Sequence, residues 1–287
     1  RKVAPDLVMV SISGFGDTGP YSQRPVYDPL IQGLSGLATV QAGADELRPQ
    51  LVRTILPDKL TGVTAAQAIT AALFARERTG ESQHVRLSML DAIIAFLWSS
   101  DMGSQTFVHS EVPQQEAASL QDLIYETTTG YITIAVQSDR EWQALIRAVD
   151  RPEWAEDPRF LTARLRQENI DARLELIQSV IKTDTAEHWL ARLEAEQVPC
   201  APVLTRTQVL DHAQVLANDL LSHYDHPQAG RLRQARAPSR FSAAPEQHWQ
   251  GAPRLGEQTG ELLAECGYSA EEIQAMCDSG IAAVPAK

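Results

Sequence analysis

Asp58 is the side chain whose place in the sequence most suggests covalent chemistry. It follows Pro57 and precedes an apolar run with helical spacing that begins at Lys59. Unpaired backbone N–H groups and the dipole at a helix start stabilise an anion. A carboxylate there can attack a thioester, and neighbouring N–H groups can stabilise the resulting oxyanion. Aspartate is also a favoured N-cap residue, so capping alone is the competing interpretation.

Gly14-x-Gly16-x-x-Gly19 is a second pattern with chemical meaning, because it follows a predicted strand. The same spacing occurs in dinucleotide-binding loops, where backbone approaches a pyrophosphate. Those loops open a helix, whereas the prolines at 20 and 25 indicate that this loop continues. The pattern therefore favours a glycine-bent loop at the carboxyl end of a strand. A nucleotide-dependent oxidoreductase is the weakest of the functions considered.

The sequence gives little indication of a metal site or of a serine-hydrolase active site. His223 and His226, with His212 upstream, fall in a stretch without a predicted helix or hairpin to converge them, which favours solvated loop histidines. The three cysteines lack CxxC spacing, which indicates neither zinc nor a disulfide framework and fits the cytoplasm. No G-x-S-x-G sequence follows a predicted strand, so no serine nucleophile can be assigned.

Hydrophobic periodicity predicts an α/β region at the start of the chain. The predicted elements are a strand at 6–13 buried on both faces, a helix at 59–78 before Gly80, a strand at 85–89, and an apolar helix opened by Asp91 and running to about 100.

A polar, proline-bearing segment at 104–120 has the composition of an interdomain connection. An α+β unit is predicted after it, with tryptophans 142, 154 and 189 as core anchors. Its predicted elements are a hairpin of 123–126 and 131–136, helices at 142–149, 165–181, 186–196 and 207–217, an extended stretch to about 255, and two short final helices. Two capping boxes are predicted, Asp184 with Glu187 and Ser269 with Glu272.

Composition narrows the class of protein. The chain has 287 residues, 44% of them apolar and 22% charged, with a formal charge of -12. Such a charge disfavours nucleic-acid binding, because phosphates would be repelled without a segregated basic patch. No apolar run approaches the roughly 18 residues that a membrane-spanning helix needs. Neither a nucleic acid nor a membrane is therefore an expected partner.

Several sequence blocks, taken in their order along the chain, resemble those of a known protein family. The longest are SISGFGDTGPYSQRPVYDPLIQGLSGL and LPDKLTGVTAAQAITAALFARERTGESQHVRLSMLDA, and the series continues through IYETTTGYITIAVQSDREW, RPEWAEDPRF and VPCAPV to RLGEQTGELLAECGY. In this order they resemble the class III CoA-transferases, the carnitine-type (CaiB/BaiF) and formyl-CoA transferase superfamily. That superfamily also contains α-methylacyl-CoA racemase. The resemblance covers essentially the whole chain.

This resemblance implies a mechanism and a set of site residues. The position matching the family's nucleophile is Asp58, which would form an aspartyl mixed anhydride and then an aspartyl-CoA thioester. The residues matching the family's CoA site are Pro25, Val26, Tyr27, Asp28 and Met89. Coenzyme A or acyl-CoA is then a substrate, a small carboxylic acid is the acceptor, and no tightly bound cofactor or metal is expected. The family's glycine-rich lid is not recognisable between 104 and 130.

The resemblance also implies a fold and an assembly. We expect an α/β, partly Rossmann-like large domain at 1–118 with a smaller α+β domain inserted at 119–205, and a return segment at 206–287 that completes the large domain. Family chains carry a further segment of about a hundred residues before the point matching Arg1, so the resemblance implies a truncated or proteolysed chain, or a partner that supplies the missing element. The family's interlocked homodimer is the expected assembly.

Two other functions stay open beside CoA transfer. The racemase branch has a histidine where this chain has Tyr27, and tyrosine, with an ordinary pKa near 10, is a poor general base at neutral pH. That difference favours transfer over racemisation. The remaining alternative is a catalytically inert fragment that serves as an interaction module.

Overall fold

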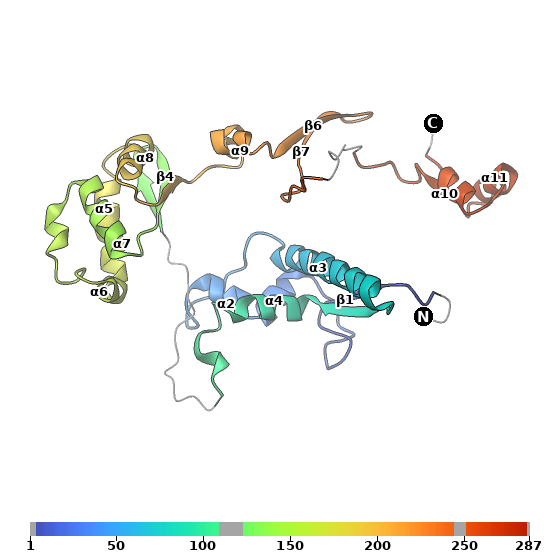
Figure 1. The fold of residues 1–287 in the computed structure, drawn as a ribbon, viewed down its shortest axis with the longest axis horizontal. Coiled ribbons are helices and arrows are strands. Elements are labelled where there is room, and N and C mark those ends of the chain that lie inside the picture. Colours follow the sequence, from blue (N-terminus) through green and yellow to red (C-terminus); the bar gives the residue numbers. More distant parts are fainter. Residues whose placement is uncertain (1–3, 109–122, 244–250, 286–287) are drawn as a thin grey trace. The chain divides into compact units, whose positions relative to one another are not determined.

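The computed structural model describes residues 4–108, 123–243 and 251–285 (Figure 1). Contacts divide the chain into two units, the first made of residues 1–124 and 170–174, and the second of 125–169 and 175–287. The predicted connection at 104–120 lies largely outside the described residues. The predicted domain boundaries, including the return of 206–287 to the large domain, stay predictions.

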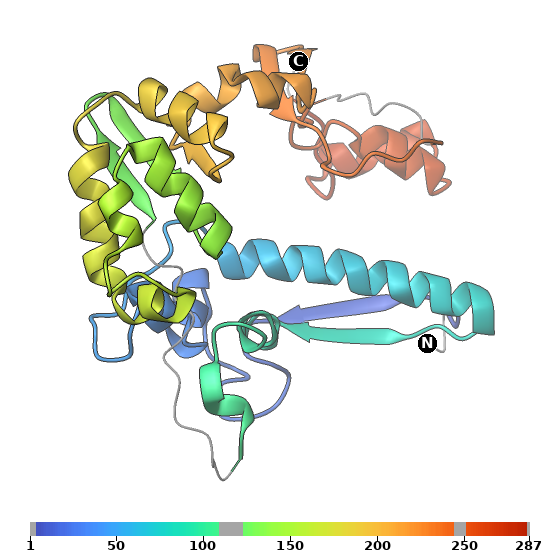
Figure 2. The same ribbon diagram turned by 60° about the vertical axis from the view of Figure 1, so that its left-hand side comes forward.

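A parallel pair of strands organises the first unit. β1 (Met9–Ser13) pairs with β2 (His84–Ser88), in a register that runs from Met9 opposite His84 to Ser13 opposite Ser88. The long helix α3 (Leu56–Thr79) connects through to β2 and lies alongside the pair in both views (Figures 1 and 2). The predicted strand, helix and parallel strand are therefore confirmed, since parallel strands require such a crossover.

The predicted burial of the first strand on both faces is wrong. Met9 and Ile12 are 50% and 55% exposed. In the described part of the chain this sheet has two strands, which is too narrow to bury both faces of either one. A continuous apolar run thus identified a strand correctly but overstated its burial.

Helix α3 begins three residues earlier than predicted. Leu56 and Pro57 already belong to it, because proline needs no N–H partner in a first helical turn and its fixed φ suits the helix. At the other end Gly80 adopts φ 74° and its N–H donates to the Arg76 carbonyl, which confirms the predicted stop.

The core of the first unit joins three further helices. α1 (Asp28–Leu34), α2 (Leu37–Ala42) and α4 (Met89–Trp98) contribute the buried residues Ile31, Leu37, Ile93 and Leu97. α4 begins at Met89 rather than at the predicted Asp91. The reason is Ser88, whose hydroxyl accepts the Asp91 N–H at 3.0 Å as an N-cap. The strand β2 therefore passes directly into α4.

The second unit contains the predicted hairpin. β3 (Ile124–Thr127) and β4 (Gly130–Ile134) are extended by β5 (Cys200–Pro202), antiparallel to β4. The helices that follow are α5 (Asp139–Val149), the short η2 (Pro152–Ala155), α6 (Ala163–Glu168), α7 (Ile170–Ile181) and α8 (Ala186–Ala195), and the first five residues of α7 are grouped with the first unit. The single helix predicted at 165–181 is thus divided at Asn169.

Aromatic side chains form the centre of this second core, as predicted. Trp142 stacks on Trp154 at 6.0 Å between ring centroids and meets Phe160 edge-on at 5.6 Å. Trp189 is also buried. These rings bury large areas and hold α5, η2 and the following loop together.

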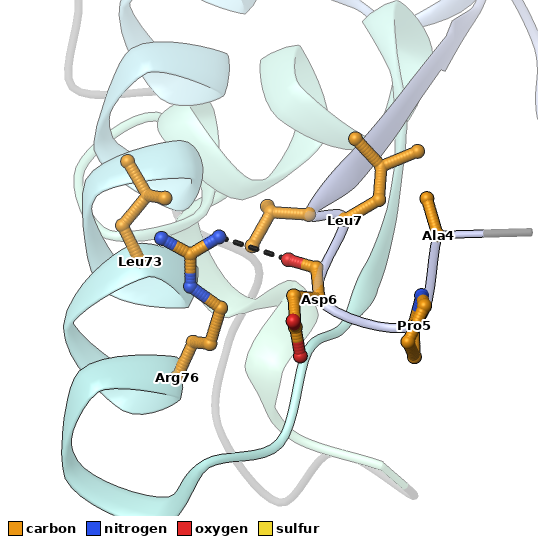
Figure 3. A pocket seen from close by; sticks show the side chains of 7 residues that line it. Ala4, Pro5, Asp6, Leu7, Leu73 and Arg76 are labelled. Atoms are coloured by element: carbon orange, nitrogen blue, oxygen red, sulfur yellow. Dashed lines mark hydrogen bonds between the residues drawn. The ribbon is translucent and has the colours of Figure 1, made fainter.

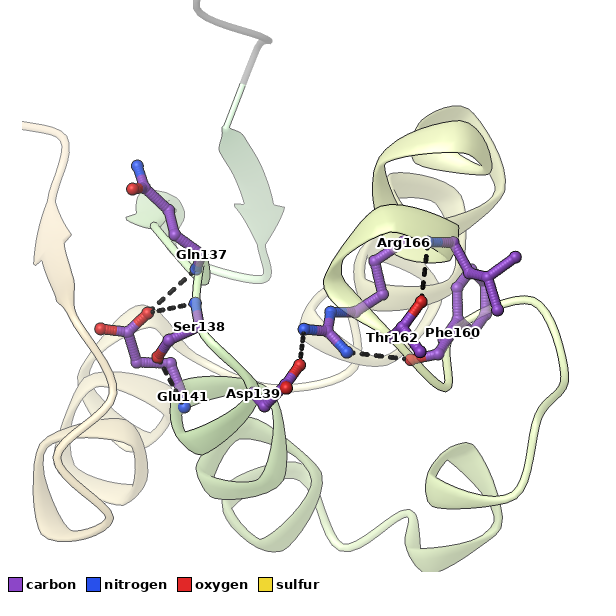
Figure 4. A network of polar contacts seen from close by, with 8 residues as sticks. Gln137, Ser138, Asp139, Glu141, Phe160, Thr162 and Arg166 are labelled. Carbon is purple, nitrogen blue, oxygen red and sulfur yellow. Dashed lines mark hydrogen bonds and ion pairs between the residues drawn. The ribbon is translucent and has the colours of Figure 1, made fainter.

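Capping residues explain where several of these helices begin. The predicted box of Ser269 with Glu272 is confirmed at the start of α11 (Ala270–Asp278). The predicted role of Asp184 is wrong, because Thr185 is the N-cap of α8 and its hydroxyl accepts the His188 N–H. A further box, unpredicted, starts α5, where Ser138 and Glu141 bond each other's backbone N–H (Figure 4).

Glu141 should make stability depend on pH through this box. Its carboxylate accepts the N–H groups of Ser138 and Gln137, both at 2.9 Å, and these bonds lower the pKa from its ordinary 4.5. A lowered folded pKa gives stability that is present above pH 4.5 and lost as pH falls through the folded value. We expect Glu141→Gln to reduce the urea midpoint at pH 6, with the difference from wild type shrinking below pH 4.5. Glu187→Gln on α8, outside any capping box, is the control and should show no such convergence.

The final part of the chain departs most from prediction. The predicted helix at 207–217 is divided into η3 (Gln208–Asp211) and α9 (Ala213–Ala217). The predicted extended stretch contains a hairpin of β6 (Leu221–His226) and β7 (Gly230–Ala235). α10 (Thr259–Glu265) and α11 follow as expected. No helix within the described ranges has both the length and the apolar composition needed to cross a bilayer.

Candidate functional site

Asp58 lies in the first turn of α3, and its side chain is exposed. The N-cap position is occupied by Ile55, so the interpretation of Asp58 as a helix N-cap is wrong. In the described part of the chain, the Asp58 carboxylate accepts no hydrogen bond and forms no ion pair. The adjacent cation, Lys59, instead donates its Nζ to Thr54 Oγ1 at 2.8 Å. Within the described residues, the Asp58 carboxylate is therefore not engaged in a hydrogen bond or ion pair.

The N–H groups at the start of α3 are all engaged. The bonds run from Leu56 N to Thr54 O (2.9 Å), from Asp58 N to Asp28 Oδ2 (3.2 Å) and from Lys59 N to Ile55 O (3.1 Å). Pro57 has no N–H to donate. The expectation that these groups would stabilise an oxyanion beside Asp58 is therefore wrong, because each is already satisfied within the fold.

Asp28 and Gln32 form a buried polar pair on α1, and this pair touches the start of α3. Asp28 is 4% exposed and Gln32 is 2% exposed. Gln32 Nε2 donates to Asp28 Oδ1 at 2.6 Å, while Asp28 Oδ2 accepts the Asp58 N–H. The structure thus brings two residues of the expected site, Asp28 and Asp58, into direct contact. Sequence reasoning missed Gln32, although its place four residues after Asp28 in an apolar run was a usable signal.

The segment before Asp28 contains the other residues expected to meet CoA. Pro25 is exposed, and the Tyr27 side chain is 77% exposed at the N-cap position of α1. Val26 is half-buried and packs so closely on Gly14 that a Cβ there would lie 2.5 Å from the Val26 Cγ1. Gly14 is therefore needed for close packing, which gives the glycine loop a structural role without any nucleotide.

Met89 reaches the same neighbourhood from α4. It is half-buried against the core cluster on which Val26 also packs. The next residue, Leu90, donates its backbone N–H to the Gly14 carbonyl at 3.0 Å. The glycine loop, the start of α1 and the start of α4 are thus fixed on one core.

One pocket lies elsewhere on the first unit, between the N-terminal segment and the far part of α3 (Figure 3). Leu7 and Leu73 line it, and Arg76 Nη1 donates across it to the Asp6 carbonyl at 2.8 Å. Leu73 follows Asp58 by fifteen residues of helix, or about 22 Å along the axis. This pocket therefore does not serve the Asp58 carboxylate.

The histidines considered as metal ligands lie in an ordered element. His223 and His226 belong to β6, so the expectation that no hairpin frames them is wrong. His226 Nδ1 accepts the N–H groups of Gln228 and Ala229, and its Nε2 contacts the Ala252 carbonyl at 3.1 Å. Within the described ranges, no three His, Cys, Asp or Glu side chains are grouped as metal ligands.

Similarity to curated proteins is consistent with this arrangement. An acetyl-CoA:oxalate CoA-transferase of Acetobacter aceti is 30% identical over 271 residues, which cover 92% of this chain and 67% of that protein. A succinyl-CoA:glutarate CoA-transferase of Mus musculus is 27% identical over 98% of this chain and 65% of that protein. The chain therefore spans about two thirds of the length of these two relatives.

A solved structure and a family model agree with those relatives. The crystal structure of a CaiB/BaiF family protein from Brucella suis superposes with a TM-score of 0.74 at 29% identity, covering 91% of this chain and 68% of that one. The mixed α/β fold is thus that of CaiB/BaiF structures. The model of CoA-transferase family III matches residues 1–259. The chain therefore belongs to family III of the CoA-transferases.

Proposed function

We propose that this protein transfers coenzyme A from an acyl-CoA to a free carboxylic acid, with Asp58 as the nucleophile. The observation that carries the proposal is the uncommitted, exposed carboxylate of Asp58 at the start of α3. A carboxylate in a first helical turn commonly stabilises the unpaired N–H groups of that turn. At the start of α3 the backbone N–H groups already have other acceptors. Family membership supplies the reaction class in which such a carboxylate is used.

The proposed chemistry needs no oxidant and no metal. An Asp58 oxygen attacks the thioester carbonyl, the C–S bond breaks, and CoA leaves as thiolate. The thiolate then attacks the aspartyl carbonyl of the mixed anhydride, which releases the donor carboxylate and forms an aspartyl-CoA thioester. An acceptor carboxylate attacks this thioester, and return of the thiolate to the acceptor's carbonyl regenerates Asp58. Covalent catalysis of this kind divides one difficult exchange into easier steps.

We assign CoA contact to Pro25, Val26, Tyr27 and Met89. Pro25 and Tyr27 are exposed, so both are accessible to a ligand, while Val26 and Met89 share the core that supports them. Tyr27 immediately precedes α1, and α1 carries the residues that hold the Asp58 backbone. We leave Asp28 out of the CoA-contacting set, because it is buried and both of its oxygens are engaged.

Small dicarboxylates are the acceptors that we propose to test first. The two relatives described above are named for oxalate and glutarate as acids and for acetyl-CoA and succinyl-CoA as thioesters, and a formyl-CoA:oxalate CoA-transferase of Streptomyces coelicolor, 28% identical to this chain, adds formyl-CoA. These acids share a second carboxylate beyond the one that accepts CoA. A binding site for that second charge is therefore part of the proposal, without assignment of its residues.

A panel assay tests this function directly. The protein is incubated with acetyl-, formyl- or succinyl-CoA and with oxalate or glutarate, and new CoA esters are identified by mass spectrometry. We expect at least one donor and acceptor pair to give the exchanged ester. Incorporation of solvent deuterium at the α-carbon of a 2-methylacyl-CoA without ester exchange would instead support racemisation. The absence of both reactions would support an inert interaction module.

We also propose a homodimer in the cytoplasm. α3 leaves large apolar side chains exposed, among them Val63 and Phe74, and burial of such groups is what a subunit interface provides. Cys200, Cys266 and Cys277 are free thiols, as a reducing compartment permits. Sedimentation equilibrium would detect the dimer, and a strictly monomeric protein at micromolar concentration would contradict it.

A further inference from the structure

We propose that Asp28 is a positioning residue for the nucleophile. Its buried carboxylate, held by Gln32, lies outside α3 and accepts the backbone N–H of Asp58. The Asp58 side chain is thereby left free to react. This inference rests on the proposed role of Asp58. It concerns how the reactive carboxylate is held, and assigns no contact between Asp28 and substrate.

The start of α3 is capped by a side chain from another helix. In α4, α5, α6, α8 and α11 a hydroxyl at the N-cap position accepts a first-turn N–H, from Ser88, Ser138, Thr162, Thr185 and Ser269 in turn, whereas α1, α2, α7, α9 and α10 have no side-chain cap. At α3 the N-cap is Ile55, which has no polar side chain. The acceptor comes instead from Asp28, thirty residues earlier in the sequence. The helix that presents Asp58 is thus capped from a distance.

The pair also fixes the chain that leads into α3. Gln32 Oε1 accepts the Val52 N–H at 2.9 Å, and Nε2 lies 3.3 Å from both the Val52 and Thr54 carbonyls. These bonds determine the orientation of the Gln32 amide, because only its oxygen can accept from Val52. Gln32 therefore anchors residues 52–54, and Asp28 anchors residue 58. Both anchors lie on one turn of α1.

The chemistry of this pair requires a carboxylate rather than an amide. Asp28 accepts from two donors, the Gln32 amide and the Asp58 N–H. An asparagine has only one acceptor oxygen, so its NH₂ group would face one of these donors. In the described part of the chain Asp28 has no cationic partner, and burying a carboxylate without one is costly. Its two hydrogen bonds offset that cost, and one of them holds the backbone of the proposed nucleophile, so positioning accounts for a buried carboxylate at this place.

The consequence concerns the Asp58 side chain. An acid in a first helical turn is drawn toward unpaired N–H groups there. With the Asp58 N–H taken by Asp28 and the Leu56 N–H by Thr54, no free donor remains on that turn to hold the side chain. The reacting oxygens keep their rotational freedom toward a thioester, while the backbone that carries them is fixed. Small displacements of a reacting group are sufficient to lower rates strongly.

Steady-state kinetics on Asp28→Ala, Asp28→Asn and wild type test the proposal. We expect Asp28→Ala to lower kcat by about 100-fold with KM for acyl-CoA changed by less than about twofold. Asp28→Asn keeps one acceptor and should lose about tenfold. Ser88→Ala is the control for stability, because it also removes a buried cap at a helix start in this unit. It should lower Tm comparably and leave kcat within about twofold of wild type.

Amide hydrogen exchange at residue 58 gives a readout that does not depend on activity. The Asp58 N–H should exchange slowly in wild type and at least tenfold faster in Asp28→Ala, with exchange in β4 unchanged. A folded Asp28→Ala with normal kcat would overturn the proposal. A raised KM at unchanged kcat would also overturn it, as would a kcat that falls in proportion to Tm across all variants. If Asp28→Ala does not fold, unaltered kcat and exchange in Asp28→Asn would overturn it. A wild type without transfer would instead remove the proposed function, which the panel assay detects separately.

Discussion

Asp58→Ala is expected to lower kcat for CoA transfer by roughly 10⁴-fold or more, the scale on which loss of a covalent nucleophile acts. The fold should survive, because the Asp58 side chain is exposed and the N–H at its position still reaches Asp28. The loss of one first-turn negative charge costs about 0.3–1 kcal/mol. The measurements are transfer kinetics with a donor and acceptor identified by the panel assay, and thermal unfolding under the same conditions.

Asp91→Ala provides a closely matched control. Asp91 is also an exposed aspartate in the first turn of a helix, α4, within the same unit. Its replacement removes the same charge from a comparable dipole, so stability should change similarly while transfer is retained. Near-normal turnover by Asp58→Ala, or equal loss of turnover in both variants, would contradict the assignment of the nucleophile.

Asp139→Ala is expected to destabilise the second unit by about 3 kcal/mol, far more than replacing an ordinary surface aspartate. The Asp139 side chain is 76% exposed, but its partner Arg166 is only 2% exposed (Figure 4). Arg166 Nη2 donates to Asp139 Oδ1, and Nη1 donates to the Phe160 carbonyl at 3.0 Å. Removing Asp139 leaves the buried guanidinium without its counter-ion. Urea unfolding followed by the fluorescence of buried Trp142 and Trp154 measures the effect.

A double-mutant cycle isolates the cause of that loss. Arg166→Met keeps much of the side-chain volume against Trp142 while removing the buried charge. In the Arg166→Met background, Asp139→Ala should therefore cost less than about 1 kcal/mol, because no unpaired cation remains. Glu187→Ala, at an exposed first-turn position of α8, is the single-site control for the removal of charge. Equal costs of Asp139→Ala in both backgrounds would show that the ion pair is not responsible.

Much of the fold could be predicted from local patterns. The spacing of apolar residues located α3, and Gly80 marked its end because a left-handed residue stops a helix. Alternation and a turn signal located the β3–β4 hairpin, and Ser269 with Glu272 located the start of α11. Each of these signals is contained within a few residues, which is why sequence alone was sufficient.

The errors arise where a boundary or a contact depends on residues far apart. The predicted α3 began at residue 59, where the apolar spacing starts, but Leu56 and Pro57 also belong to its first turn, which is capped from α1. Strand β1 was predicted as fully buried because an apolar run does not reveal how wide its sheet is. The β6–β7 hairpin was missed because its strands, LSHYDH and GRLRQA, are polar.

In the candidate site, too, local sequence signals could be recognised while contacts between distant residues could not. Resemblance placed Asp58, Tyr27 and Asp28 in one region, and the structure adds the contact between Asp28 and the Asp58 backbone. Nothing in a single sequence indicates that residues thirty positions apart share a hydrogen bond, nor that Gln32 binds the segment at 52–54. The geometry is therefore the basis for proposing that Asp58 reacts and that Asp28 holds its backbone in place.

The most direct measurement is covalent trapping on the wild-type protein. After incubation with an acyl-CoA that supports transfer, borohydride reduces an aspartyl thioester to the alcohol, and peptide mass spectrometry locates the modified residue. Reductive conversion of residue 58 to homoserine, dependent on acyl-CoA and absent without borohydride, is the predicted result. A protein that exchanges CoA between acids while the peptide containing Asp58 stays unmodified, or while another residue is converted, would contradict the account.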